Sequence, residues 1–381
     1  MAYGVLLTGA TGAIGPTLAS ELLDQGAGHT LRILVRPSIR GGDRFSGWLG
    51  SVADVARADG RHVDFSRVSA IHADLRVDGL GLSRAQTDEL ARDTQVIIHA
   101  AADTGFRSPP EDQWNTNVNG LRRILELSAQ CRRLRKVIVV STVCVSGTMT
   151  GRVRECLCSE MPGFVNHYER TKWEAERLAA ASRLPVEIVR LSIVSGSHAT
   201  GAVHRMGALH HVLRWFGRGL IPRVPGTPLT GVDLIATETA AAFLARAVMT
   251  PTDPGLVCHV AAGEQAVPLA DLMSFTWQQA RSTGPAATTD DPSRPQLVDG
   301  DAFRRFCDAL DPVRQRILQQ SMESVQTCLP ILLYPRVYET ARAQRLWGGP
   351  LPLYDWRQTL ARVLRMSHPQ PRPVAPGADA A

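Results

Sequence analysis

Residues 4–15 read Gly-Val-Leu-Leu-Thr-Gly-Ala-Thr-Gly-Ala-Ile-Gly, and this stretch decides the fold. Its first five residues are an apolar run bounded by glycines, which predicts a short buried strand. A helical pattern of leucines follows over residues 18–23. Three evenly spaced glycines therefore lie between a strand and a helix, and this context favours a nucleotide-binding loop over an ordinary turn.

Each glycine of the loop has its own expected role. Gly9 permits the tight turn, Gly12 lets a pyrophosphate approach the backbone, and Gly15 lets the helix pack on the strand. The phosphates would lie at the helix N-terminus. The expected cofactor-binding set in this loop also includes Thr11, Ala13 and Ile14.

The residue after the second predicted strand, 31–35, bears on the choice of dinucleotide. An enzyme selective for NAD usually carries an acidic residue there, whereas this chain carries Arg36. A guanidinium pairs bidentately with a 2′-phosphate, so Arg36, with Arg40 and Arg44 nearby, predicts NADPH, with NADH as the alternative. A solvated arginine loop is the competing interpretation.

Further apolar runs alternate with helical stretches. They predict strands over residues 68–72, 95–99, 136–140, 186–189 and 257–260 and a helix over 118–133. This rhythm predicts an α/β fold, a Rossmann-type doubly wound parallel sheet covered by helices on both faces.

Ligands of such sheets gather at the carboxyl ends of the strands. At those ends Asp74 can accept a hydrogen bond from the adenine amine. Ala100, Ala101 and Ala102 are small enough for a cofactor to lie against the backbone, although tight packing explains them equally.

Tyr168 and Lys172 form a Tyr-x-x-x-Lys pair, which a helix would place on one face. A nearby ammonium favours the phenolate and lowers the phenol pKa from about 10, so the pair predicts an acid/base unit. Only two of the 42 basic residues are lysines, and the other, Lys136, starts a predicted strand and has no such role. A coding bias toward arginine is the simplest alternative explanation of this imbalance.

Two further residues complete the expected catalytic set. Thr142 follows a predicted strand, and its hydroxyl can donate to the carbonyl oxygen that Tyr168 protonates; most threonines at such positions only form turns. Asn117 opens the helix predicted over 118–133, where it anchors a water that relays protons to Lys172 or serves simply as an N-cap.

Six short motifs along the chain belong together: residues 8–15, 74–75, 99–102, 117–120, 140–143 and 168–172. Together they resemble the extended short-chain dehydrogenase/reductases over roughly residues 1–263. Residues 168–176, Tyr-Glu-Arg-Thr-Lys-Trp-Glu-Ala-Glu, are similar to a stretch of the thioester reductase domains, which are relatives of fatty acyl-CoA reductases. Thr142 and residues 102–106 fit the same branch.

The resemblance implies NADPH-dependent hydride delivery to a carbonyl carbon. Thr142 and Tyr168 would activate the oxygen, Lys172 would bind the nicotinamide ribose and tune the phenol, and Leu75 would join Asp74 at the cofactor. In thioester reductases the substrate is an acyl thioester and the product an aldehyde or alcohol. Two departures leave the substrate open: no proline follows Arg190, and we expect no adenylation or carrier domain in the chain.

The substrate can therefore be a carrier-bound acyl group, an acyl-CoA or a small ketone. A reductase, dehydrogenase or epimerase of a free ketone, alcohol or sugar is one alternative function. A non-catalytic NADP-sensing protein is another, although such proteins commonly lose the tyrosine.

The length of 381 residues accommodates two parts. We expect an NADP-binding domain over 1–196, to which 232–263 return, and a smaller, mainly helical substrate lobe from 197–231 and 264–366. A polar loop around 282–297 and a disordered Pro- and Ala-rich tail over 367–381 are also expected.

The remaining composition points to a cytoplasmic enzyme. We expect no cleavable signal before the first strand, and no apolar run approaches the roughly 20 residues of a membrane span. Seven cysteines, an odd number, suggest reduced thiols, and Cys156 and Cys158 lack a second pair, so we expect no metal site.

The net charge of +6 includes a basic group over residues 122–136. We expect this group to form a solvated face or a subunit contact. An acyl carrier protein or the phosphates of CoA are the anionic partners that the charge suggests. We expect no nucleic-acid binding. In the lobe, His210 and His211 are expected on a helix surface, and Phe216 in the core.

Overall fold

The computed structural model describes residues 3–24, 28–37, 44–105, 108–158, 160–161, 163–281, 294–311 and 314–367. The predicted tail over 367–381 falls outside them except for Ser367, which ends helix α14 (Trp356–Ser367). The predicted loop over 282–297 falls outside them up to residue 293. Its last two residues belong instead to strand β14 (Gln296–Val298), which pairs with β9 (Arg223–Pro225).

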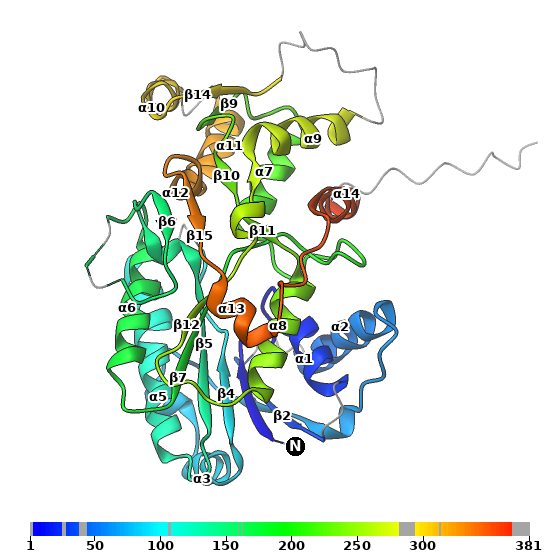
Figure 1. The fold of residues 1–381 in the computed structure, drawn as a ribbon, viewed down its shortest axis with the longest axis vertical. Helices are drawn as coiled ribbons and strands as arrows, with labels where there is room; N and C mark the ends of the chain where they lie inside the picture. Colours follow the sequence, from blue (N-terminus) through cyan, green and yellow to red (C-terminus); the bar gives the residue numbers. More distant parts are fainter. Residues whose placement is uncertain are drawn as a thin grey trace, which may run out of the picture.

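A seven-stranded sheet forms the centre of the molecule, with the order β12-β7-β5-β4-β1-β2-β3 and every neighbouring pair parallel. The doubly wound Rossmann-type fold is thereby confirmed (Figure 1). The strands are β1 (Gly4–Thr8), β2 (Thr30–Val35), β3 (Val68–His72), β4 (Val96–His99), β5 (Lys136–Thr142), β7 (Val186–Leu191) and β12 (Val257–Val260).

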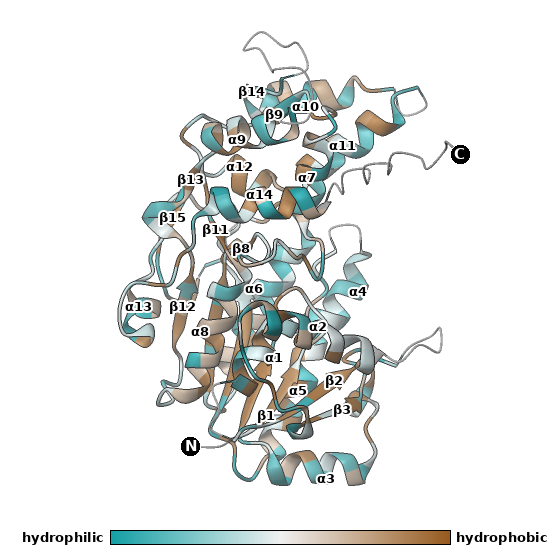
Figure 2. Cartoon of the chain, turned by 90° about the vertical axis from the view of Figure 1, so that its right-hand side faces the viewer, coloured by the Kyte–Doolittle hydropathy of each residue, from teal (hydrophilic) through white to brown (hydrophobic). Residues whose placement is uncertain are grey.

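The two faces of the sheet carry separate apolar cores. Because side chains alternate along a strand, Val5 and Leu7 belong to one core while Leu6 between them belongs to the other. The first core contains residues of α1 (Gly15–Asp24), α2 (Arg44–Ala58) and α8 (Thr237–Met249); the second contains residues of α3 (Arg84–Asp93), α5 (Gly120–Gln130) and α6 (His167–Ala181). Figure 2 shows the strands as a hydrophobic layer between helices with polar outer faces.

A third apolar core holds together the lobe above the carboxyl ends of the strands (Figure 1). Its helices are α7 (Ala208–Phe216), α9 (Leu269–Arg281), α10 (Gly300–Asp308), α11 (Arg316–Gln326), α12 (Leu329–Leu332) and α14. Two short pairs, β10 (Gly231–Val232) with β13 (Val267–Pro268) and β8 (Ile193–Val194) with β11 (Leu234–Ile235), lie where the chain passes between lobe and sheet.

One segment departs from the predicted division into domain and lobe. Strand β15 (Arg336–Tyr338) pairs with β6 (Gly151–Val153), and α13 (Ala341–Trp347) packs near β12 and α8. Ala343 and Leu351 are accordingly buried in a core of the sheet domain. Residues 336–351, predicted to belong to the lobe, thus return to the sheet because their apolar side chains complete its edge.

Both lysines of the chain are buried. Lys136 is 1% exposed, and its ammonium donates to the two Glu187 carboxylate oxygens at 2.8 and 3.0 Å and to the carbonyl of Ala247 at 2.9 Å. This ion pair joins β5 to β7 and to the end of α8. Lys136 therefore has a structural role that the sequence did not indicate.

Candidate active site

The glycine positions of the loop leave no room for a side chain. Gly9 has φ +77°, and a Cβ there would lie 2.6 Å from the backbone of Ala100 and Ala101. A Cβ on Gly15 would lie 1.8 Å from the carbonyl oxygen of Ala10. The chain is thus folded tightly between β1 and α1, and the N-terminus of α1 faces the end of the sheet.

A cavity of about 650 Å³ runs from this loop to the lobe. Most of the residues predicted to bind cofactor or to act in catalysis line it: Gly9, Thr11, Gly12, Ala13, Ile14, Arg36, Asp74, Leu75, Ala100, Ala101, Ala102, Thr142, Tyr168 and Lys172. Gly15 and Asn117 lie behind the lining. Arg40 lies outside the described residues, as does the side chain of Arg44.

Hydrogen bonds at the ends of β1 and β4 fix the floor of the cleft, and sequence reasoning missed them. The Thr8 hydroxyl is 2.9 Å from His99 Nδ1 and accepts from the Ala101 amide at 3.2 Å. Burial, reinforced by the charge of Lys172, lowers the pKa of His99 to about 3, so the ring is neutral. This buried pair orients the alanine backbone along which a cofactor would lie.

Asp74 lies in the cleft but already has a partner. Arg76 donates from Nη2 and Nε to its two carboxylate oxygens, at 2.7 and 3.0 Å. These hydrogen bonds are the main reason that the pKa of Asp74 is lowered, and Arg36 contributes a smaller electrostatic share. Arg76 also lines the cavity. Arg76 was not among the residues expected at the cofactor site, although it follows Asp74 by only two residues.

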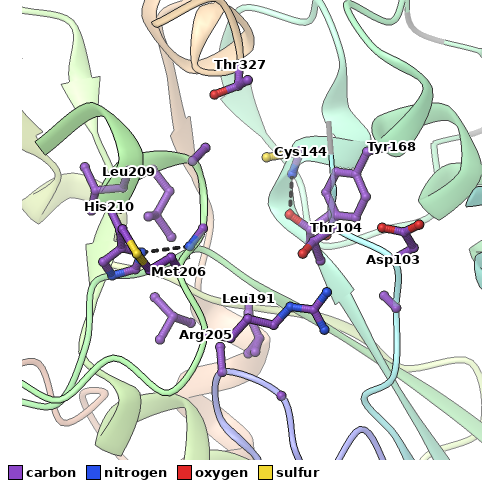
Figure 3. Close-up of a pocket in the computed structure, with 18 of the residues that line it drawn as sticks. Asp103, Thr104, Cys144, Tyr168, Leu191, Arg205, Met206, Leu209, His210 and Thr327 are labelled. Atoms are coloured by element: carbon purple, nitrogen blue, oxygen red, sulfur yellow. Dashed lines mark hydrogen bonds between the residues drawn. The ribbon is translucent and has the colours of Figure 1, made fainter. Parts of the chain in front are cut away.

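Thr142 and Tyr168 meet at the carboxyl end of β5. Thr142 Oγ1 accepts from the Cys144 amide at 3.2 Å, and the Thr142 side chain also hydrogen-bonds Tyr168. Tyr168 lies in the first turn of α6, which begins where Asn166 caps the Glu169 amide. Figure 3 shows the Tyr168 ring beside Cys144, Thr104 and Asp103 on one side of the cavity.

Burial is the largest influence on the pKa of Tyr168 and raises it above its ordinary value, while the Thr142 side chain acts in the opposite direction. The Lys172 ammonium donates to the carbonyl of Val140 at 2.9 Å, and burial lowers its own pKa to about 8. The phenol therefore carries its proton near neutral pH.

Asn117 does not open a helix, so the N-cap interpretation is wrong. A short π-helix over Asn115–Asn119 joins α4 (Pro110–Trp114) to α5 without a break. Asn117 is 2% exposed; its Oδ1 accepts from the Asp103 amide at 2.7 Å, and its Nδ2 donates to Thr171 Oγ1 at 3.0 Å. Short π-helical segments within α-helices are frequent at functional sites. Here Asn117 ties the loop after β4 to the helix that carries Tyr168 and Lys172.

Glu169 is a titratable group of the site that sequence reasoning missed. It is 1% exposed and lines the cavity. Its Oε2 accepts from the Val165 amide at 3.0 Å, while Oε1 has no hydrogen-bond partner. Burial raises the pKa of Glu169 to about 7.

Glu169→Gln is expected to stabilise the protein more at pH 8 than at pH 5. The carboxyl ionises near 4.5 ordinarily and near 7 in the folded chain, so the folded state holds its proton more tightly. The stability of the native chain therefore falls as the pH rises from about 4.5 to about 7. Glutamine does not titrate and escapes this loss. Urea unfolding of both proteins at the two pH values measures the effect, and an equal difference at both would contradict it.

The lobe closes the cavity from the other side, where Figure 3 shows His210, Met206 and Leu209. The prediction that His210 lies on a helix surface is wrong: it is 7% exposed, its Nδ1 accepts from the Gly207 amide at 3.0 Å, and its Nε2 lies 3.1 Å from the Ser195 carbonyl. Both ring nitrogens thus contact backbone groups. Phe216 is buried as predicted, and it also lines the cavity.

Three further sequence expectations concern thiols, metals and membranes. All seven cysteines are free thiols. Within the part of the chain that the structure describes, no group of three or more His, Cys, Asp or Glu side chains is placed to hold a metal ion. No helix among the described residues is both long and apolar enough to cross a bilayer.

A parallel sheet with a glycine loop after β1, and a Tyr-Lys pair and a threonine at its carboxyl edge, define an extended short-chain dehydrogenase/reductase. The chain belongs to the male sterility protein family, whose NAD-binding family model matches residues 7–244. The resemblance seen in the sequence motifs is thereby confirmed, together with the enzyme class.

Two curated proteins illustrate the relationship. An isonitrile lipopeptide synthase of Streptomyces coeruleorubidus is 31% identical over 215 residues, which cover 55% of this chain and 14% of that protein. The fatty acyl-CoA reductase wat of Drosophila melanogaster is 26% identical over 251 residues, 57% of this chain and 48% of that protein. The chain thus matches less than half of the length of either relative.

Solved structures share the fold over nearly the whole chain. The terminal R domain of the myxalamid PKS-NRPS biosynthetic pathway has a TM-score of 0.74 at 21% identity, covering 96% of this chain and 90% of that one. A thiolation-reductase di-domain from an archaeal non-ribosomal peptide synthetase has a TM-score of 0.68 at 18% identity, covering 95% and 74%.

Proposed function

We propose that the chain is an NADPH-dependent reductase that delivers hydride to the carbonyl carbon of an acyl thioester. The observation that carries the proposal is that Thr142, Tyr168 and Lys172 line one continuous cavity with the glycine loop on one side and the apolar lobe on the other. The names of the relatives, a lipopeptide synthase and a fatty acyl-CoA reductase, support an acyl substrate.

The residues of the cleft fit a dinucleotide. Gly9 and Gly12 carry no side chain in the loop where a pyrophosphate would lie, the wall over residues 100–102 is built of alanines, and Arg36 also lines the cavity. When bound, the cofactor supplies the hydride. Lys172 then holds the nicotinamide ribose, and the protonated Tyr168, aligned by Thr142, donates a proton to the substrate oxygen as negative charge develops there.

Arg36→Gln is expected to raise KM for NADPH by roughly tenfold to one hundredfold and to leave KM for NADH nearly unchanged. The variant loses one charge-assisted bond to the 2′-phosphate, which only NADP carries. Arg36 is exposed, so the substitution leaves the cores intact. Arg57→Gln on α2, also exposed, is the matched control. An equal rise in KM for NADPH and for NADH would contradict the assignment of Arg36 to the 2′-phosphate.

We also propose that the thioester is presented by CoA or an acyl carrier protein, as the thiolation-reductase relative suggests. Within the basic group over residues 122–136, Arg132, Arg133 and Arg135 are poorly placed to dock either. They precede β5, whereas Thr142 ends that strand, so they are separated from Thr142 by the strand length of about 20 Å. Arg123 lies nearer, since it donates to the carbonyl of Leu75, which lines the cavity. The seven free thiols fit a reducing compartment, which supports the cytoplasm as its location.

The test is NADPH consumption against acyl-CoA, acyl-pantetheine thioesters and a panel of free ketones, with the product identified. Aldehyde or alcohol formed from a thioester supports the proposal. Turnover of ketones alone would replace it with the free-ketone alternative, and cofactor binding without any turnover would favour a sensor.

A further inference from the structure

The cavity extends beyond the catalytic residues into an arm within the lobe. We define the lobe arm by six of its lining residues: Leu209, Leu213, Phe216, Leu272, Met273 and Val325. They come from α7, α9 and α11 and belong to the lobe core or pack against it. The arm is thus a space inside an apolar core that opens toward Tyr168.

The polar groups along this arm are already used within the protein. Thr276 donates from its hydroxyl to the carbonyl of Leu272 at 2.8 Å, and Thr327 donates to that of Ser324 at 2.6 Å. His210 contacts backbone groups through both ring nitrogens. Among the described lobe residues that line the cavity, Arg205 is the one charged side chain, and it is exposed. A polar or charged acyl group would therefore lose its hydration without finding partners in the arm.

A second cavity of about 180 Å³ lies beyond the arm. Its lining includes Trp277, Arg294 and Leu297, and it shares two residues with the first cavity, Phe216 and Met273. These two side chains therefore form a partition between the spaces. Phe216 is 4% exposed and packs edge-on against Trp277, with ring centroids 6.3 Å apart, while Met273 is an unbranched, flexible side chain.

We propose that the lobe arm binds an extended apolar acyl group and that the Phe216–Met273 partition sets the longest chain accepted. The proposal rests on the proposed function for the position of the reacting carbonyl at Tyr168. Each methylene that enters the arm leaves water, so affinity rises with chain length until the chain meets the partition. Longer chains must displace Phe216 or Met273 to enter the second cavity.

The first experiment measures calorimetric binding of straight-chain primary alcohols of increasing length to the full chain with NADP⁺ present. Affinity is expected to rise about fourfold per added methylene and then to stop rising at a defined length. Met273→Ala should move that length upward by about three carbons, since the substitution removes three heavy atoms from the partition. Phe216→Leu should move it in the same direction.

Phe303→Leu is the matched control. Phe303 is 1% exposed in the same lobe core but lines neither cavity, so its substitution should leave the length limit unchanged. Thermal unfolding shows that each variant is folded. The assignment of the partition would be overturned if the length limit stayed unchanged in both Met273→Ala and Phe216→Leu. It would also be overturned if the limit moved as far in Phe303→Leu. Equal affinity for alcohols bearing a terminal carboxylate would overturn the apolar character of the arm.

The second experiment repeats the series with acyl thioesters and measures kcat/KM. The same length limit in binding and in turnover supports both proposals. A length limit in binding without any reduction of thioesters would retain the apolar arm and refute the proposed function. Reduction of thioesters at rates independent of chain length would retain the proposed function and refute the apolar arm.

Discussion

Replacing Tyr168 with phenylalanine is expected to lower kcat by roughly 10²- to 10⁴-fold, the usual contribution of a positioned general acid. The half-buried phenol hydrogen-bonds the Thr142 side chain, and desolvation keeps its pKa above the ordinary value. Phenylalanine preserves the ring and the packing but removes the proton. The measurement is steady-state turnover of the best thioester found, together with NADPH affinity from fluorescence titration.

NADPH affinity should change little in Tyr168→Phe, since the glycine loop, Arg36 and Lys172 remain. A matched control is Tyr334→Phe, a phenol of the same protein that does not line the cavity. It should retain full turnover. Wild-type turnover in Tyr168→Phe would refute the mechanism, and parallel loss of cofactor binding would assign the residue to binding instead.

Lys136→Met is expected to lower the free energy of unfolding by about 3–5 kcal/mol, because it leaves Glu187 ionised and buried without its counter-charge. Both side chains are 1% exposed. Burial raises the pKa of Glu187, and Lys136 holds it down, so removing the ammonium forces the carboxylate either to take up a proton or to stay uncompensated. Urea unfolding at pH 7 measures the loss.

The double variant Lys136→Met/Glu187→Met should recover most of this stability, because two apolar side chains of similar length replace the pair. Arg57→Met breaks an ion pair with Asp54 whose side chains are about three-quarters exposed, and it should change stability little. A loss from Lys136→Met as small as that from Arg57→Met would show that the buried pair contributes no more than a surface pair.

Much of the fold could be predicted from local sequence because its signals are local. Strands at residues 4–8, 68–72 and 257–260 were placed at their observed bounds, since a buried parallel strand is a continuous apolar run closed by turn residues. The glycine loop could also be predicted, because backbone geometry dictates the spacing of its glycines. The Tyr168–Lys172 spacing likewise placed both side chains in one cavity.

Other features depend on contacts between distant segments and had no local signal. The N-cap reading of Asn117 failed because a short π-helix continues the helix through that residue. The lobe assignment of residues 336–351 failed because β15 pairs with β6, far earlier in the chain, and α13 packs near β12 and α8. Glu169 was overlooked because only burial by the surrounding elements makes its carboxyl unusual.

The sequence by itself determined the class of sheet, the phosphate-binding loop and the Tyr-Lys pair, since backbone conformation and helical spacing are encoded within a few residues. Only the tertiary structure decided the protonation of the site, because desolvation requires the assembled cavity. It also decided that Lys136 is a buried ion-pair partner and that Phe216 and Met273 stand between two cavities. These properties arise from side chains that meet only after the lobe has folded over the carboxyl edge of the sheet.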